Sequence, residues 1–132
     1  MSLRSPLGKA LGMGAAKEGA GHWWAQRVSA VGLVLLAPWF LLSLIALGDL
    51  GYVNVTHWMS TPLNTVLLSL LVVTLAYHAQ LGLQVVVEDY VPSKNTRMLV
   101  MLVINFGLLL LGVLGVFSVL RVALLGHVAG NG

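Results

Sequence analysis

Residues 28–47 read VSAVGLVLLAPWFLLSLIAL, a run of twenty residues without a charged side chain. A helix of this length rises about 30 Å, which is the thickness of the hydrocarbon core of a bilayer. Pro38 lies inside the run, and membrane helices tolerate an internal proline more readily than soluble ones. With its flanks included, the stretch predicts a membrane-spanning helix over about residues 25–47.

The chain carries two more apolar runs of spanning length. With their flanks, they predict helices over about residues 62–89 and 97–125. Gly- and Asp-bearing residues 48–54 separate the first two helices, and residues 91–96, which contain Pro92, separate the last two.

Composition agrees with this reading. Of the 132 residues, 58% are hydrophobic and only 8% are charged, whereas a soluble domain is about a quarter charged. The chain cannot hide so much apolar surface within itself, so lipid has to cover most of it. We expect one all-α domain over residues 1–132, an integral membrane bundle of three helices preceded by a cytoplasmic tail over residues 1–24.

The charged residues stand singly at the ends of apolar runs, which is typical of membrane orientation signals and not of a nucleic-acid patch. The chain has no cysteine, which excludes disulfides and Cys-ligated zinc or iron–sulfur clusters within it. Six of the seven basic residues lie in the tail and at the start of the first helix, or between the second and third helices, whereas Arg121 lies near the far end of the third. The positive-inside rule therefore predicts a cytoplasmic N-terminus and a C-terminus on the opposite side. These six residues are Arg4, Lys9, Lys17 and Arg27, then Lys94 and Arg97.

His78 lies deep in the second predicted helix, and intramembrane ionisable residues are usually functional. Asp89 follows after 11 residues, so the two side chains fall within about 20° on one helical face. Gly82, one turn from His78, leaves room on that face. His78 either hydrogen-bonds a neighbouring helix or is an axial ligand of haem iron, with the second histidine supplied by another chain. The other histidines lie at helix ends or in loops: His22, His57 and His127.

Two interfacial groups accompany His78. Arg27 lies at the cytoplasmic end of the first predicted helix, where it either reaches lipid phosphates or pairs with an anionic group such as a haem propionate. Asp89 and Tyr90 end the second helix, either as membrane-boundary residues or as a quinone site. A phenol can donate a hydrogen bond to a quinone carbonyl, and a carboxylate can orient donors and relay protons.

The third predicted helix carries small residues at intervals of three, Gly112, Gly115 and Ser118. We interpret them as surfaces for close helix packing. Asn105 in the same helix, and Glu88 before Asp89, receive no role from the sequence.

The second helix carries H-x10-D-Y, and the stretch HWW-x-QR-V-S (22–29) leads into the first. Together they resemble the hydrophobic membrane-anchor subunits of succinate dehydrogenase (respiratory complex II). The N-terminal stretch SPLGKALGMGAAKEGAGHWW (5–24) is similar to the bacterial branch closest to mitochondria. The resemblance implies a bacterial inner membrane with a periplasmic C-terminus, or alternatively the mitochondrial inner membrane.

The resemblance further implies that this chain is one half of a two-subunit anchor that holds the flavoprotein and iron–sulfur subunits on the membrane. His78 corresponds to the ligand of a haem b shared with a second three-helix anchor, and Arg27 to a basic residue near the haem propionates. Tyr90 corresponds to the tyrosine that binds ubiquinone, and Asp89 to the acidic residue beside it. Succinate oxidation takes place elsewhere in such a complex, and this chain shows no flavin or dicarboxylate site.

Two alternatives stay open on the sequence. The first is a fumarate reductase anchor, which carries electrons in the reverse direction. The second is a small non-redox membrane protein for assembly or transport, which would explain three helices but not the stripe from His78 to Tyr90.

Overall fold

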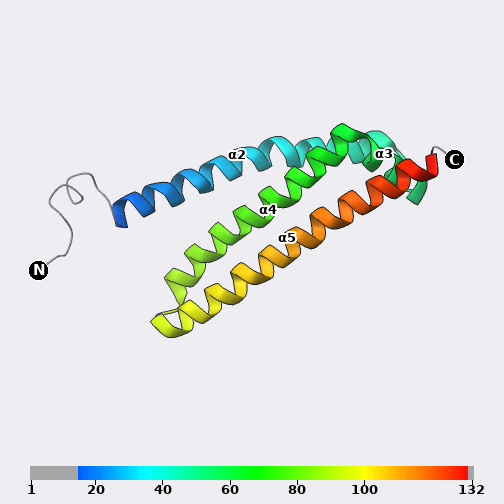
Figure 1. Cartoon of the computed structure of the whole chain (residues 1–132). Coiled ribbons are helices and arrows are strands. Elements are labelled where there is room, and N and C mark those ends of the chain that lie inside the picture. Colours follow the sequence, from blue (N-terminus) through cyan, green and yellow to red (C-terminus); the bar gives the residue numbers. More distant parts are fainter. Residues whose placement is uncertain (1–14, 131–132) are drawn as a thin grey trace, which may run out of the picture.

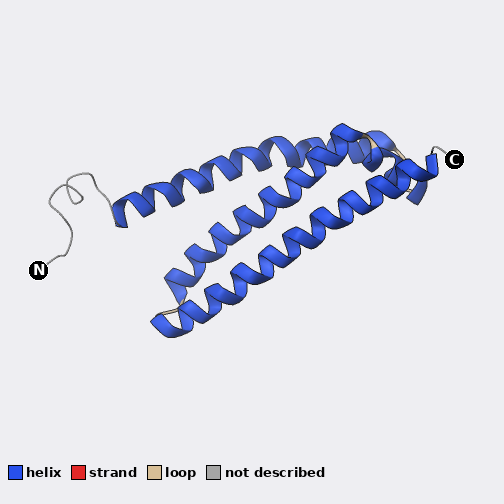
Figure 2. Cartoon of the chain, in the orientation of Figure 1, coloured by secondary structure: helices blue, strands red, loops and turns tan. Residues whose placement is uncertain are grey.

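The computed structural model describes residues 15–130, and every element within that range is an α-helix (Figures 1 and 2). Three of the four helices are long and apolar enough to cross a membrane. The all-α fold with three long apolar helices is thereby confirmed. The helices are α2 (Ala15–Leu47), α3 (Tyr52–Ser60), α4 (Pro62–Tyr90) and α5 (Lys94–Gly130), and the candidate spans are Gly19–Leu47, Pro62–Tyr90 and Lys94–Gly126.

The middle helix, α4, packs against both α2 and α5. In Figure 1, α4 and α5 run side by side in opposite directions, whereas the first half of α2 diverges from the end of α4. Helix α2 begins at one end of the molecule and α5 ends at the other, as an odd number of crossings requires.

Helix α2 begins at Ala15, about ten residues before the start that the sequence predicts. Most of the expected tail over residues 1–24 lies outside the described residues, but its last ten residues are helical. Hydropathy marks where a membrane span begins, whereas a helix needs only favourable local propensity, and the AAKE sequence at 15–18 consists of good helix formers. As a result, Arg27 lies twelve residues after the start of α2 and not at its first turn.

The connection between the first two long helices contains α3, where the sequence predicts only a break. Gly48 ends α2 at a φ of 71°, a conformation that favours glycine. The carboxylate of Asp49 then accepts hydrogen bonds from the backbone N–H of Gly51 and the side chain of Asn54.

Tertiary contacts hold α3 against the long helices. The ring of Trp58 stacks on Trp39 of α2 with centroids 5.7 Å apart, and the centroid of the Phe40 ring lies 6.1 Å from the same ring. Gly126 of α5 faces Ser60 and the carbonyl of Thr56 so closely that a β-carbon there would collide with the hydroxyl. Packing, and not the apolar content of the segment, therefore accounts for α3.

Glycines set the spacing of α4 and α5, as the sequence predicts for Gly112 and Gly115. A β-carbon at Gly115 would lie 2.7 Å from Cγ1 of Val72, and one at Gly112 would lie 3.5 Å from Cβ of Ala76. Ser118 instead is exposed and donates to the carbonyl of Leu114 in its own helix.

The turn between α4 and α5 is closed by Arg97. Its Nε donates to the carbonyl of Val91 at 3.1 Å, and its guanidinium also reaches the carbonyl of Pro92 at 3.4 Å. A cation at the C-terminal end of α4 complements the helix dipole, which the neighbouring carboxylates Glu88 and Asp89 oppose.

Most large apolar side chains lie on the outside of the described residues. Ile45 of α2, for example, is 74% exposed. Such a surface is stable only when lipid or other protein chains cover it. The few buried hydrophobic residues are Leu36, Leu68, Leu71, Leu81, Val87, Val119 and Ala123.

Candidate functional site

His78 lies near the middle of α4, twelve residues or about 18 Å before the helix ends at Tyr90. Its Nδ1 lies 2.8 Å from the hydroxyl Oγ of Ser29 on α2. The hydrogen bond to a neighbouring helix is therefore present, as one of the two interpretations of this histidine requires. It occupies only one of the two ring nitrogens, so it does not conflict with a ligand role for the other.

Nε2 of His78 has no hydrogen-bond partner among residues 15–130. In the part of the chain that the structure describes, the buried side-chain polar atoms that lack a partner are Nε2 of His22 and Oγ of Ser69, and Nε2 of His78 is not one of them. This nitrogen therefore keeps some accessible surface among the described residues. Neutral imidazole binds metals through such a nitrogen.

The face of α4 that carries His78 is closed by α2 on one side of the histidine and open on the other. One turn before His78, Thr74 packs against Gly32, where a β-carbon would lie 3.2 Å from the threonine methyl group. One turn after His78, a β-carbon at Gly82 would meet nothing within 4 Å. The two helices therefore part just beyond the Ser29–His78 pair, in agreement with the divergence in Figure 1.

Arg27 lies two residues before Ser29, so it is only about 3 Å farther along the axis of α2. Its guanidinium carbon lies 5.2 Å from the ring centroid of Trp23, in cation–π geometry. The arginine is exposed, and no carboxylate of the described residues pairs with it. Its charge is therefore available to an anionic group from outside the chain.

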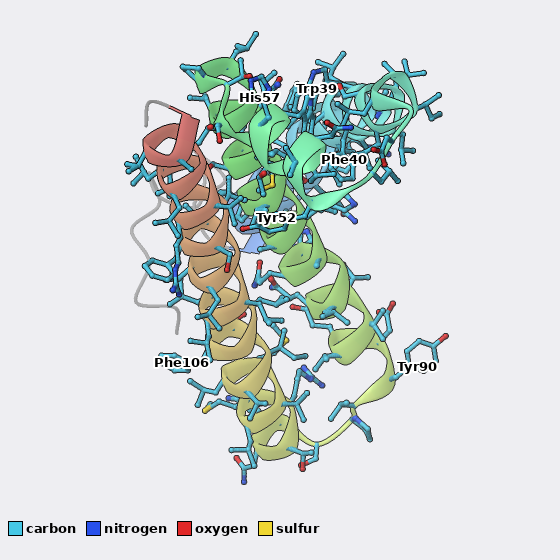
Figure 3. All side chains as sticks on the ribbon, turned by 90° about the vertical axis from the view of Figure 1, so that its right-hand side faces the viewer. Trp39, Phe40, Tyr52, His57, Tyr90 and Phe106 are labelled. Atoms are coloured by element: carbon cyan, nitrogen blue, oxygen red, sulfur yellow. The ribbon has the colours of Figure 1, made fainter. Side chains whose placement is uncertain are left out.

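Asp89 and Tyr90 are exposed at the end of α4. Figure 3 shows the Tyr90 ring pointing outward from the helices, and 80% of this residue is exposed. Within residues 15–130, neither side chain has a hydrogen-bond partner. The structure thus does not bring Arg27, His78 and Tyr90 into mutual contact. Asp89 shares the face of α4 that carries His78, whereas Tyr90 lies about 120° around that helix and Arg27 lies about 200° around α2 from Ser29.

Four polar residues form a ladder of hydrogen bonds along another face of α4, and two of them, Asn105 and Glu88, received no role from the sequence. Gln80 donates through Nε2 to Oδ1 of Asn105 on α5 at 3.1 Å and reaches Oε1 of Gln84 at 3.5 Å. Gln84 in turn donates to Oε1 of Glu88 at 3.1 Å. Asn105 therefore joins α4 to α5, and Glu88 ends the ladder at the turn.

Ser29 is the site residue that sequence reasoning missed. It is the one buried polar side chain in the part of the chain that the structure describes, with 5% of its surface exposed. The available signal was a hydroxyl inside an apolar run and two residues after Arg27, but its partner lies 49 residues away on another helix.

The residues around His78 fit a haem. A porphyrin supplies four of the six iron ligands, so the protein need only provide axial imidazoles. This fits a chain whose described residues contain no group of three or more His, Cys, Asp or Glu side chains. Among the described residues, Nε2 of His78 has no partner, which suits an iron ligand, and a β-carbon at Gly82 would meet nothing, which leaves room for a flat ring. Arg27 is exposed and carries the charge that a propionate would need.

The fold and the site define a class: a small multi-pass membrane protein with polar residues on an open side between its first two long helices. Residues 1–114 match the family model of the succinate dehydrogenase/fumarate reductase transmembrane subunit. The chain belongs to this family. No solved structure matches it significantly.

Curated relatives place the chain more closely within the family. It is 40% identical over 96 residues to the succinate dehydrogenase hydrophobic membrane anchor subunit of Rickettsia bellii, covering 72% of this chain and 76% of the relative. The subunit of the same name from Rickettsia conorii is 31% identical over 104 residues, with 78% and 82% covered. That from Paracoccus denitrificans is 27% identical over 107 residues, with 81% and 83% covered. The chain is accordingly a membrane anchor subunit of the succinate dehydrogenase complex.

Proposed function

We propose that this chain is one half of a two-subunit anchor that binds a shared haem b and forms part of the ubiquinone-reduction site. The observation that carries the proposal is the single deep histidine of α4, which among the described residues forms a hydrogen bond through Nδ1 and none through Nε2. One histidine supplies half of a bis-histidine site, so the second axial ligand comes from a sister anchor. Haem bound there supplies a one-electron carrier within the membrane.

Arg27 is the residue proposed to neutralise the haem propionates. Its backbone lies about 3 Å from that of Ser29 along the axis of α2, so at nearly the depth of His78. The two positions are about 200° apart around the helix, so the long side chain of Arg27 has to reach around α2 toward the haem edge. A buried propionate without a cation would carry a large desolvation cost. Trp23, beneath the guanidinium at 5.2 Å, holds the side chain without neutralising its charge.

Asp89 and Tyr90 are proposed to bind the quinone head group. Reduction of a quinone consumes two electrons and two protons, so the site needs apolar walls for the tail and proton-capable groups near water. The Tyr90 phenol donates a hydrogen bond to a quinone carbonyl, and the Asp89 carboxylate orients donors and relays protons from the aqueous side. Neither residue carries electrons, so the electrons reach the quinone from a partner subunit.

Because this chain neither oxidises succinate nor carries electrons to the quinone by itself, it requires partner subunits. A flavoprotein subunit oxidises succinate, an iron–sulfur subunit carries the electrons, and a second three-helix anchor completes the membrane part. Basic residues lie near the start of α2 and at the α4–α5 turn. By the positive-inside rule, this end of the bundle faces the bacterial cytoplasm, and the end of α5 faces the periplasm. The open side at Gly82, next to His78, is the part of the chain's surface that we assign to the sister anchor.

Purification of the tagged chain from its own membranes in mild detergent tests the assembly. We expect a flavoprotein, an iron–sulfur protein and a second three-helix anchor in the mass spectrum, together with a reduced-minus-oxidised haem b spectrum. Purification of the chain alone, or without haem b, would contradict the proposal.

Replacement of the histidine tests the ligand. His78→Ala should abolish or shift the haem b spectrum, because the iron loses its axial nitrogen from this chain. His57→Ala is the control, since His57 is exposed on α3. An unchanged spectrum in the His78 variant would refute the ligand role.

A further inference from the structure

The hydroxyl of Ser29 has two polar neighbours and only one hydrogen. Oγ lies 3.0 Å from the carbonyl oxygen of Gln26, one turn earlier in α2, and 2.8 Å from Nδ1 of His78. A carbonyl oxygen can only accept, whereas a hydroxyl and a ring nitrogen can each donate or accept.

If both contacts are hydrogen bonds at once, this count of hydrogens sets the tautomer of the histidine. When the Ser29 hydrogen goes to the carbonyl of Gln26, a lone pair of Oγ faces Nδ1. The 2.8 Å contact is then a hydrogen bond only if Nδ1 carries the proton and donates it. In a neutral imidazole the other nitrogen, Nε2, is then unprotonated.

We propose that Ser29 is a positioning residue that holds His78 in the Nδ1–H tautomer, fixes its ring plane and leaves the Nε2 lone pair free for haem iron. The inference rests on the proposed ligand role of His78. Histidines that bind metals commonly donate their other ring N–H to an oxygen, which sets the tautomer and raises the basicity of the ligand. The acceptor here is a buried hydroxyl whose own hydrogen is already used, so it cannot reverse its role without losing the bond to Gln26.

The packing of α2 on α4 keeps this hydroxyl in place. Gly32, one turn after Ser29, lets α2 approach α4 closely enough to touch Thr74. Ser29 is 5% exposed, so water does not readily compete for Nδ1. The bond is thus built into the helix interface and is present before any group binds.

Loss of the hydroxyl should raise the midpoint potential of the haem. A hydrogen bond accepted from Nδ1–H increases electron donation by Nε2, which stabilises ferric iron more than ferrous iron. A neutral hydrogen bond is worth enough to change an equilibrium roughly threefold to tenfold. At 59 mV per tenfold for one electron, the potential should rise by about 30 to 60 mV.

The test compares Ser29→Val with Ser29→Thr in the purified complete complex. Valine and threonine have the same shape, but only threonine keeps a hydroxyl. Redox titration of haem b gives the potential, and the largest g value of the ferric low-spin signal reports the angle between the axial imidazole planes. Ser118→Ala is the control, because that hydroxyl bonds only within α5.

We expect the valine variant to shift both the potential and the g value, or to lose haem, while the threonine variant and the control match the wild type. Unshifted readouts in the valine variant would overturn the inference. Equal shifts or equal haem loss in both Ser29 variants would do the same, because the hydroxyl would then not be the cause. An absence of haem from the wild-type complex, or its indifference to His78→Ala, would instead refute the proposed function itself.

Discussion

The side-chain amide of Gln80 donates to the side-chain oxygen of Asn105 at 3.1 Å across the interface of α4 and α5. Gln80 is two residues from His78, about 200° around the helix, so the two side chains serve different neighbours. His78 meets α2, and Gln80 meets α5. Helix α4 is therefore the central element that fixes both polar contacts.

Removal of either amide should destabilise the pair of helices, because the hydrogen bond between α4 and α5 is lost and Gln80 keeps only its longer contact with Gln84 in its own helix. A double-mutant cycle of Gln80→Leu and Asn105→Leu should give a coupling energy of about 0.6 kcal/mol, and at most about 1.7 kcal/mol. The measurement is the apparent free energy of unfolding in an SDS titration of the purified complex. Gln80→Leu combined with Ser118→Ala should be additive, and additivity of the first pair as well would show that the bond is not formed.

The close approach at Gly115 gives a second prediction. Gly115→Ala places a methyl group 2.7 Å from Cγ1 of Val72, a stiff side chain in a helix. The helices have to separate, at a cost of about 1 to 3 kcal/mol. Val72→Ala in the same chain should restore much of the stability in thermal unfolding. Gly107→Ala is the control, because nothing lies within 4 Å of a β-carbon there, and equal losses at both glycines would contradict the packing explanation.

The sequence predicted the three long helices because each apolar run is long enough to span the membrane. It missed the start of α2, because helical structure continues past the point where hydropathy falls. It also missed α3, because the nine-residue segment YVNVTHWMS has no strong period and depends on Trp39 and Phe40 for its packing.

The parts of the candidate site that lie on a single helix were predictable from the sequence. The depth of His78 and the spacing to Asp89 follow from counting along a single helix. Ser29 and the Gln80–Asn105 pair depend on which helix faces which, and the sequence leaves that choice open. These contacts become visible only when α2, α4 and α5 are placed relative to one another.

The open space at Gly82 should be needed for assembly. A β-carbon at Gly82 meets no atom of the described residues within 4 Å, so the fold of this chain leaves the start of the leucine side chain in Gly82→Leu unobstructed. A bulky side chain one turn from His78 should nevertheless obstruct the haem or the sister anchor. We expect a lower haem-to-flavin ratio in the purified complex. Gly107→Leu on α5 should leave that ratio unchanged, and a normal ratio in the Gly82 variant would show that nothing approaches there.

Tyr90→Phe separates the two interpretations of the Asp-Tyr pair. The ring and its interfacial contacts stay, and only the phenol hydroxyl is lost. If that hydroxyl binds a quinone carbonyl, the loss of one neutral hydrogen bond should lower kcat/KM for ubiquinone by roughly threefold to tenfold, and by more if it also donates a proton. Succinate oxidation by a soluble artificial acceptor measures the amount of intact complex and normalises the rate. Tyr77→Phe is the matched control, because Tyr77 is a half-exposed tyrosine on the same helix, where it lines the α4–α5 groove. Equal ubiquinone rates in both variants and the wild type would assign Tyr90 to the aromatic belt alone, whereas a loss confined to Tyr90 would support the quinone site.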